Sequence, residues 1–323
     1  MKTVLSRLHV GAGTSIGPLT LFPVWSEKAT TTKVVLPNDT NFKVSELPSE
    51  SVPHLLVENC GSEDLLIVEG TILEGGYQTR IAAHDYVVAP GETLQIEVRC
   101  VEAGRWGGHA REHQADGRAP WHVLSSLRKT LRPEGYEGRS QHEVWESVRR
   151  IEHFFGQKPS SSLNDIFADE GMSRRKPRSN PEESRPRIRE DRIVTVEILE
   201  ELERIASKPL PGQQGVVIGI AGEVVSLELY STPELFQEQY LAILQAACLD
   251  AVFADWSMTP GWKARSFAAK VSDTELDILQ KDHTFQTSRG LNEDIDLRVI
   301  VPSDELDATL RVSALNRKHL VNA

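Results

Sequence analysis

One short stretch of the chain, residues 69–80 (EGTILEGGYQTR), gathers residue types that could bind or transform a ligand. Its polar and conformationally special members are the carboxylates Glu69 and Glu74, the glycine pair Gly75 and Gly76, the amide Gln78 and the guanidinium Arg80. Adjacent glycines permit positive φ and a close approach of the backbone. An amide beside a five-donor guanidinium suits recognition of carboxylate or phosphate. The alternative is a glycine-rich hairpin whose polar residues only meet solvent.

A second stretch of the same kind lies at residues 100–106 (CVEAGRW). Arg105 could grip an anion, Trp106 could stack on a ring, and Glu102 could bind a hydroxyl or a metal. Equally, Trp106 could anchor the core while Arg105 forms a surface ion pair. Each glycine-bearing stretch follows an apolar strand candidate. If those two strands are neighbours, the stretches meet at one end of a sheet.

Two histidines, His109 and His113, follow four residues apart, a spacing that places both on one face of a helix. The flanking glycines and the pair Asp116-Gly117 favour a loop instead. We therefore predict solvated loop histidines here and no metal site.

Composition limits the possible classes of protein. The 323 residues can form two domains or one large one, and 39% hydrophobic and 26% charged residues are typical of a soluble globular protein. A net charge of −11 argues against nucleic-acid binding through bulk charge. The 3 cysteines are too far apart for a disulfide framework or a zinc pattern. With neither a signal peptide nor a membrane-spanning run in the sequence, we predict a cytoplasmic protein without membrane association.

Short strand candidates dominate the first third of the chain. The clearest is 94–100, where apolar and polar residues alternate; the others are 19–25, 41–47, 52–58, 65–69 and 77–88. We predict an α+β protein whose N-terminal domain, residues 1–118, is a mainly antiparallel β sandwich or barrel carrying both stretches. Apolar periodicity predicts helices at 119–131 and 141–155, within a helical segment, 119–170, that packs on this domain.

Residues 171–191 are rich in arginine and proline, which predicts a flexible linker or loop. Beyond it we predict a C-terminal α/β part, residues 192–323. Its expected elements are a helix at 194–205, a hairpin at 215–230, a long helix capped by Thr232, and strands at 296–301 and 309–315. Cys248 falls in the apolar stripe of the long helix, so we interpret it as a core residue. Residues 267–271 are ambiguous.

Several of these residues resemble one known family. The run at 57–59 (VEN), the stretch 65–80 with its Glu-Gly and Gly-Gly-x-Gln-x-Arg, the stretch 100–106, and the segment 215–248 are similar to the ARG and Rhodanese-Phosphatase-superfamily-associated protein domain, where ARG stands for ADP-ribosylglycohydrolase. The chain departs from the family pattern at Tyr77 and Thr79, where the family usually has a basic residue and Asn.

The resemblance implies a prokaryotic, cytosolic protein that handles a nucleotide or an ADP-ribose-like ligand. The first hypothesis is a ligand-binding protein or hydrolase in which Arg80 and Arg105 hold phosphates on the glycine-rich loops. Trp106 would stack a ring, and Glu69, Glu74 or Glu102 would act as base. The second is a metal enzyme using Glu102 and the two histidines. The third is a noncatalytic module whose arginine-rich segment binds an acidic protein or nucleic acid. No cofactor can be named from the sequence, and neither can the oligomeric state.

Overall fold

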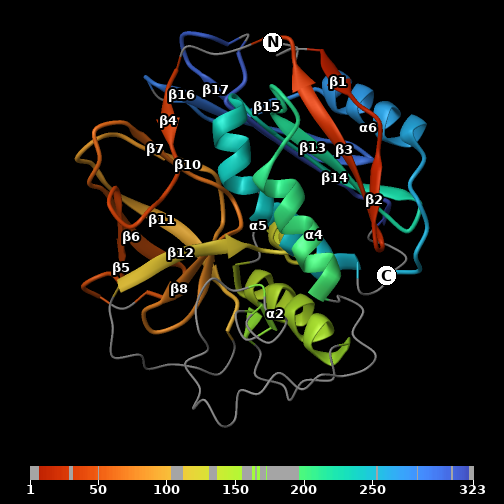
Figure 1. Ribbon diagram of the computed structural model, residues 1–323. Helices are drawn as coiled ribbons and strands as arrows, with labels where there is room; N and C mark the ends of the chain where they lie inside the picture. Colours follow the sequence, from red (N-terminus) through yellow and green to blue (C-terminus); the bar gives the residue numbers. More distant parts are fainter. Residues whose placement is uncertain are drawn as a thin grey trace. The chain divides into compact units, whose positions relative to one another are not determined.

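The computed structural model describes residues 7–28, 32–49, 51–102, 112–130, 137–154, 162–163, 166–167, 172, 196–251, 254–281, 283–306 and 308–319. The chain forms two compact units (Figure 1). One unit contains residues 1–33 and 200–323, and the other contains residues 34–199. Both are built mainly from antiparallel strands with packed helices, which confirms the predicted α+β class. No helix in the described ranges has both the length and the apolar character needed to cross a bilayer.

The 34–199 unit is built around a closed barrel of short antiparallel strands. In barrel order these are β11 (Thr93–Cys100), β6 (His54–Asn59), β5 (Phe42–Ser45), β12 (Glu112–Arg118), β8 (Thr71–Gly75) and β9 (Arg80–Ala82), and pairing of β9 with β11 closes the ring. A small sheet of β10 (Tyr86–Val88), β7 (Asp64–Ile67) and β4 (Val34–Val35) shares the barrel's hydrophobic core. The sequence predicted a sandwich or a barrel, and the structure has the barrel.

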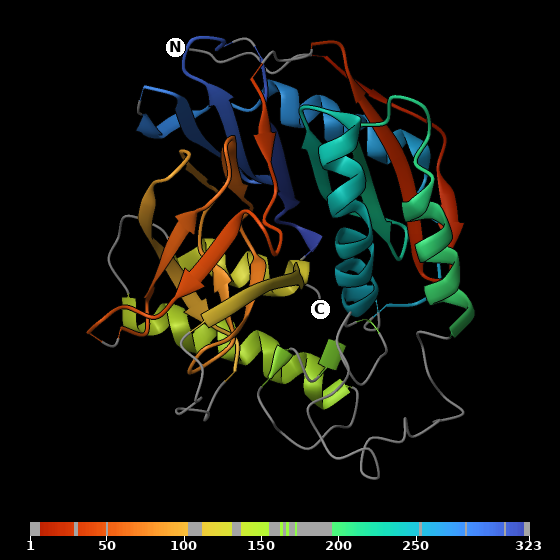
Figure 2. The same cartoon turned by 60° about the vertical axis from the view of Figure 1, so that its left-hand side comes forward.

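Two helices of the same unit accompany the barrel. They are α1 (Trp121–Thr130) and α2 (Glu137–Phe154), shown in yellow-green beside the orange strands in Figure 2. The side chain of Gln141 on α2 bonds the backbone of Cys100 twice, donating from Nε2 at 2.6 Å and accepting at Oε1 at 2.9 Å. Val144, Val148 and Ile151 are fully buried, as their helical spacing predicted.

A nine-stranded antiparallel sheet forms the other unit. Its order is β1 (Leu8–Val10), β3 (Leu19–Ser26), β13 (Gly215–Ile220), β14 (Glu223–Tyr230), β18 (Arg311–Asn316), β17 (Ile295–Pro302), β16 (Phe285–Leu291) and β15 (Asp277–Lys281), with β2 (Thr14–Ile16) also paired to β3. The predicted hairpin of β13 and β14 is present, and its turn uses positive φ at Ala221 and Gly222.

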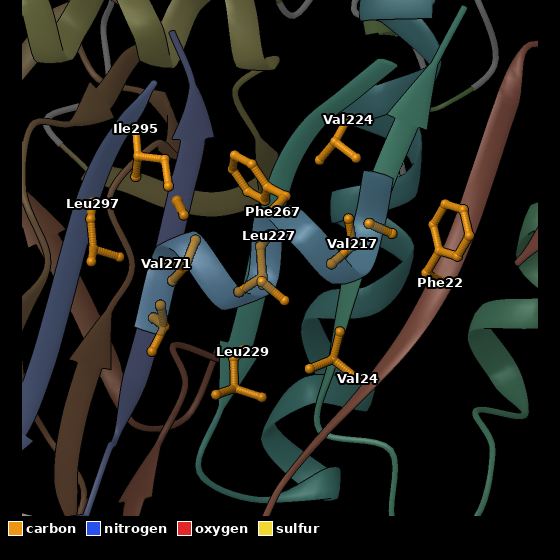
Figure 3. Close-up of a cluster of buried hydrophobic side chains, with 14 of the residues drawn as sticks. Phe22, Val24, Val217, Val224, Leu227, Leu229, Phe267, Val271, Ile295 and Leu297 are labelled. Atoms are coloured by element: carbon orange, nitrogen blue, oxygen red, sulfur yellow. The ribbon is translucent and has the colours of Figure 1, made fainter. Parts of the chain in front are cut away.

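Helix α6 (Gly261–Asp273) supplies the hydrophobic cover for one face of this sheet. Phe267 and Val271 lie among aliphatic side chains of the strands, including Leu227 and Leu297 (Figure 3). The ambiguous residues 267–271 are therefore helical. Alternation along each strand sends every second side chain to this face, so one amphipathic helix buries a continuous apolar layer.

The long helix α5 (Pro233–Ala251) packs against β3, β13 and β14. Its start follows the predicted capping chemistry, because the Thr232 hydroxyl accepts the N–H of Leu235 at 3.2 Å. Cys248 is fully buried, and burial raises the pKa of its thiol to about 12. The thiol is therefore uncharged at neutral pH, and Cys248 is a core residue, as predicted. Helix α4 (Val196–Ser207) precedes β13 and occupies the region predicted as helix.

The boundary between the units differs from the expected end of a domain at residue 118. Strand β3 pairs with β13 from Leu19↔Ile220 to Val24↔Gly215, so the first strands complete the sheet formed by the C-terminal residues. The described helices of the predicted segment 119–170, α1 and α2, fall in the barrel unit. Within the predicted linker 171–191, only Met172 belongs to the described residues.

Candidate functional site

The described parts of the two glycine-bearing stretches lie side by side at the barrel. Cys100 on β11 is the register partner of Arg80 on β9. Beyond this pair, Val101 donates its N–H to the carbonyl of Thr79 at 3.0 Å, and Thr79 donates its N–H to Glu102 Oε2 at 2.9 Å. Pairing of β9 with β11 thus brings the two stretches together. The condition on the preceding strands is not what does so, because β7, the strand that the first stretch follows, pairs with β10 and β4. Arg105, Trp106 and His109 lie outside the described residues.

The candidate carboxylates occupy different surroundings. Glu69 is fully buried and pairs with Arg128 of α1, with 2.9 Å between its Oε2 and Arg128 Nε. Glu102 is 8% exposed and accepts the Thr79 N–H, so it fastens the two stretches together. Glu74 is half-buried on β8, where it is the register partner of Gln114. Gln78 is buried, with its Nε2 3.5 Å from the carbonyl oxygen of Glu102.

Arg80 is fully buried, and its two terminal nitrogens point to internal oxygens, whereas its Nε has no hydrogen-bond partner among the described residues. One terminal nitrogen donates to the carbonyls of Ser51 and Val52 at 3.0 and 2.9 Å, and the other lies 3.4 Å from Glu46 Oε1. Burial lowers the pKa of Arg80, and the charge of Glu46 opposes that shift. The guanidinium therefore anchors the 51–52 segment and the Glu46 carboxylate to the glycine-bearing stretch.

Glu46 is the centre of the buried polar cluster. Its Oε1 accepts from the Tyr77 N–H at 3.1 Å and from Arg80, and it lies 3.1 Å from His113 Nε2. Its Oε2 is buried and has no hydrogen-bond partner among the residues that the structure describes. Burial raises the pKa of Glu46. The His113 hydrogen bond, the Tyr77 N–H and the Arg80 charge outweigh burial, so the pKa lies below its usual value.

His113 lies between two acceptors. Its Nδ1 is 3.3 Å from the carbonyl oxygen of Leu73, and its Nε2 faces the Glu46 carboxylate. A carbonyl and a carboxylate can only accept, so each ring nitrogen of His113 faces an acceptor. The cluster thus places the Glu46 carboxylate between Arg80 and His113 inside the protein.

The glycine pair permits this close packing. Gly75 and Gly76 have φ of +122° and +52°, as their use at a tight turn predicted. A Cβ on Gly76 would lie 2.1 Å from His113 Nε2 and 2.8 Å from Glu46 Oε1. Only glycine lets the backbone pass this near the imidazole and the carboxylate.

Sequence reasoning missed two members of this cluster. The prediction of a solvated loop at His113 is wrong, because His113 is 4% exposed on β12, between β5 and β8. Residues 112–118 (EHQADGR) lack apolar alternation, and barrel closure rather than local propensity makes them a strand. Glu46 stands alone among residues of ordinary composition, so no sequence signal could have identified it.

Across the described ranges, no group of three or more His, Cys, Asp or Glu side chains is arranged to hold a metal ion. The proposed set of Glu102, His109 and His113 includes one residue outside those ranges.

Comparison with models of protein families identifies the family of this chain. Searches of curated proteins and of solved structures return no match. The model of the ARPP-1 family, described as the ARG and Rhodanese-Phosphatase-superfamily-associated Protein domain, matches residues 7–313. That range includes most of both compact units and every residue of the Glu46 cluster. The chain therefore belongs to the ARPP-1 family.

Proposed function

We propose that this protein binds a nucleotide or an ADP-ribose-like small molecule, and that Glu46 accepts a sugar hydroxyl of that ligand. The main support for this proposal is the arrangement around the Glu46 carboxylate. Its Oε1 has three neighbouring nitrogens, whereas its buried Oε2 has no hydrogen-bond partner among the described residues. An unsatisfied buried acceptor costs about 1–3 kcal/mol, so a ligand hydroxyl donating to Oε2 would recover that free energy. Carboxylates commonly recognise ribose through its hydroxyls.

The depressed pKa of Glu46 favours binding over proton abstraction. A carboxylate held ionised by Arg80 and His113 is a good acceptor at neutral pH but a weak base. Arg80 and His113 act as positioning residues, because the terminal nitrogens of Arg80 and both ring nitrogens of His113 already face internal oxygens. The choice of ligand class draws on the family name, which records an association with ARG. Hydrolysis by another carboxylate, such as the half-buried Glu74, is the alternative.

Titration calorimetry and thermal-shift assays with ADP-ribose, NAD and ATP test the proposal. We expect at least one of them to raise the melting temperature of the wild-type protein. Glu46→Gln should weaken binding of that ligand at least about tenfold, because an amide cannot replace the ionised acceptor.

Glu228→Gln is the matched control. Glu228 is also buried against an arginine, with Arg311 at 3.0 Å, but it lies in the sheet unit. Both substitutions should lower stability by a similar amount, since each removes one charge from a buried pair. Only Glu46→Gln should weaken ligand binding, measured below the melting transition of both variants. No response of the wild type to any of the ligands, or equal weakening in both variants, would contradict the proposal.

Chromatography of the incubated ligand separates binding from hydrolysis. Intact ligand after prolonged incubation with wild-type protein is expected. Release of products that persists in Glu46→Gln but stops in Glu74→Gln would assign the protein to the hydrolase alternative.

A further inference from the structure

The outer edge of the nine-stranded sheet is formed by β15, residues Asp277–Lys281. Within the described chain, β15 pairs with β16 and with no other strand. All of its residues are exposed, and its two large apolar side chains, Ile278 and Leu279, are 57% and 52% exposed. An open strand edge presents backbone N–H and C=O groups that a further strand can pair.

The sequence of this edge, DILQK, is complementary to itself in an antiparallel arrangement. With Leu279 opposite its own copy, Asp277 of one strand faces Lys281 of the other, and the same pair recurs by symmetry at the opposite end. Ile278 faces Gln280 in the same register. Neither Asp277 nor Lys281 has an ion pair within the described residues, so both charges are available.

We propose that β15 pairs with β15 of a second copy of this chain, forming a symmetric dimer with one continuous sheet. Such an arrangement is isologous, since the same five-residue surface serves both partners. Opposite charges on directly facing strand positions stabilise pairing, and like charges oppose it.

The lysine of this edge favours this particular partner, because an edge lysine hinders pairing with a foreign strand that offers it no opposite charge. The bulge between Ile278 and Gln280 weakens pairing with any strand, a second copy included. In the self-paired register Lys281 is neutralised by Asp277, whereas a shifted register or an unrelated strand leaves it uncompensated. The edge is therefore selective for its own sequence. The small contact area predicts a weak dimer, with dissociation in the micromolar range.

Charge exchange at these two positions gives a sharp test by sedimentation velocity at protein concentrations of about 10–500 µM. The wild-type chain should show a concentration-dependent monomer–dimer equilibrium. Asp277→Lys alone and Lys281→Asp alone should each weaken the dimer about tenfold or more, because both facing pairs become like-charged. The double variant D277K/K281D should restore it.

Mixing the two single variants provides the decisive measurement. A strand with lysines at both positions complements a strand with aspartates at both, so the mixture should form heterodimers while each variant alone stays monomeric. Because each variant serves as the other's partner, restored dimer also shows that both are folded. Lys43→Asp is the control: it makes the same charge change at an exposed position of β5, which is paired on both sides, and should leave the dimer unchanged.

A wild-type chain that remains monomeric throughout the concentration range would overturn the proposal. A dimer whose dissociation constant is unchanged by both single charge reversals would also overturn the proposal, because that dimer would use another surface.

Discussion

At the scale of single residues, the close packing of the Glu46 cluster requires a glycine in the backbone beside it. Glu46, Arg80 and His113 come from separate parts of the chain and meet where Gly76 leaves no side chain between them. The value of the glycine pair was predictable, because positive φ and close approach are properties of glycine itself. The sequence did not predict that Glu46 and His113 are the side chains that approach Gly76, because neither belongs to a segment with a periodic hydrophobic pattern.

Replacement of Gly76 by alanine tests this close packing. We expect Gly76→Ala to lower the free energy of unfolding by about 2–5 kcal/mol, from positive-φ strain together with the overlap between the new Cβ and His113. Urea denaturation measures the change.

Gly91→Ala is the matched control, since Gly91 has φ of +74° but a Cβ added there would meet no atom within 4 Å. Gly91→Ala should lower the free energy of unfolding by only about 1 kcal/mol, because it introduces the positive-φ strain without a steric overlap. Equal costs for the two substitutions would show that the approach to His113 is not tight.

Glu97 predicts a specific pH dependence of stability. The hydrogen bond from His84 and the charge of Arg99, working against burial, lower the pKa of Glu97 from 4.5 to about 2. A depressed folded-state pKa means that the stabilisation is complete above about pH 4.5 and is lost as pH falls toward 2. Glu97→Gln should therefore show a smaller fall in urea midpoint than wild type between about pH 5 and pH 3.

The same titration of Glu58→Gln gives the reference, because Glu58 is an exposed carboxylate on the neighbouring strand β6. Its midpoint should track the wild type. Since the side chains of His84 and Glu97 are 35% and 34% exposed, added salt should shrink the Glu97 effect. If Glu97→Gln leaves the fall in urea midpoint between about pH 5 and pH 3 unchanged, this carboxylate is excluded as a source of acid sensitivity.

At the scale of elements, sequence patterns predicted those whose burial follows a local period. Strand β11 alternates, α2 and α5 carry apolar stripes, and the hairpin of β13 and β14 brackets a turn. Strands β12, β15 and β16 were missed. Their sequences are rich in polar residues, and pairing with neighbours rather than alternation of hydrophobicity makes them strands.

Helix α6 contributes to its unit mainly through one face. Phe267→Ala removes an aromatic side chain that is 6% exposed within the sheet core, and should cost about 3–5 kcal/mol of unfolding free energy. Ser266→Ala, one position earlier on the exposed face, should change stability by less than about 0.5 kcal/mol. Equilibrium urea denaturation of both variants checks the difference. Similar small losses for both would mean that α6 is not a principal cover of the sheet.

At the scale of the whole molecule, the sheet unit is assembled from the two ends of the chain. Strand β3 lies inside the sheet, between β1 and β13, so the C-terminal residues alone leave one side of β13 unpaired. The sequence could identify β3 as a strand from its composition, but not its partner. Pairing between segments so distant in sequence leaves no local trace.

Fragments test this interdependence. We expect residues 200–323 alone to show no cooperative thermal unfolding, because β13 would expose an unpaired apolar edge. Residues 7–33 joined to 200–323 by a flexible Gly/Ser linker should restore a cooperative transition followed by circular dichroism. Cooperative unfolding of 200–323 alone, equal to that of the joined fragment, would show that β3 is dispensable.

The interior position of β3 also bears on how the chain emerges during translation. A ribosome synthesises Leu19–Ser26 long before Gly215–Ile220, and the intervening residues take roughly 10 to 40 seconds at the usual elongation rates. Throughout that interval β3 has β1 and β2 as partners but not β13. The sheet is thus completed only after the barrel residues have been synthesised, a delay that a contiguous arrangement of the same strands would avoid.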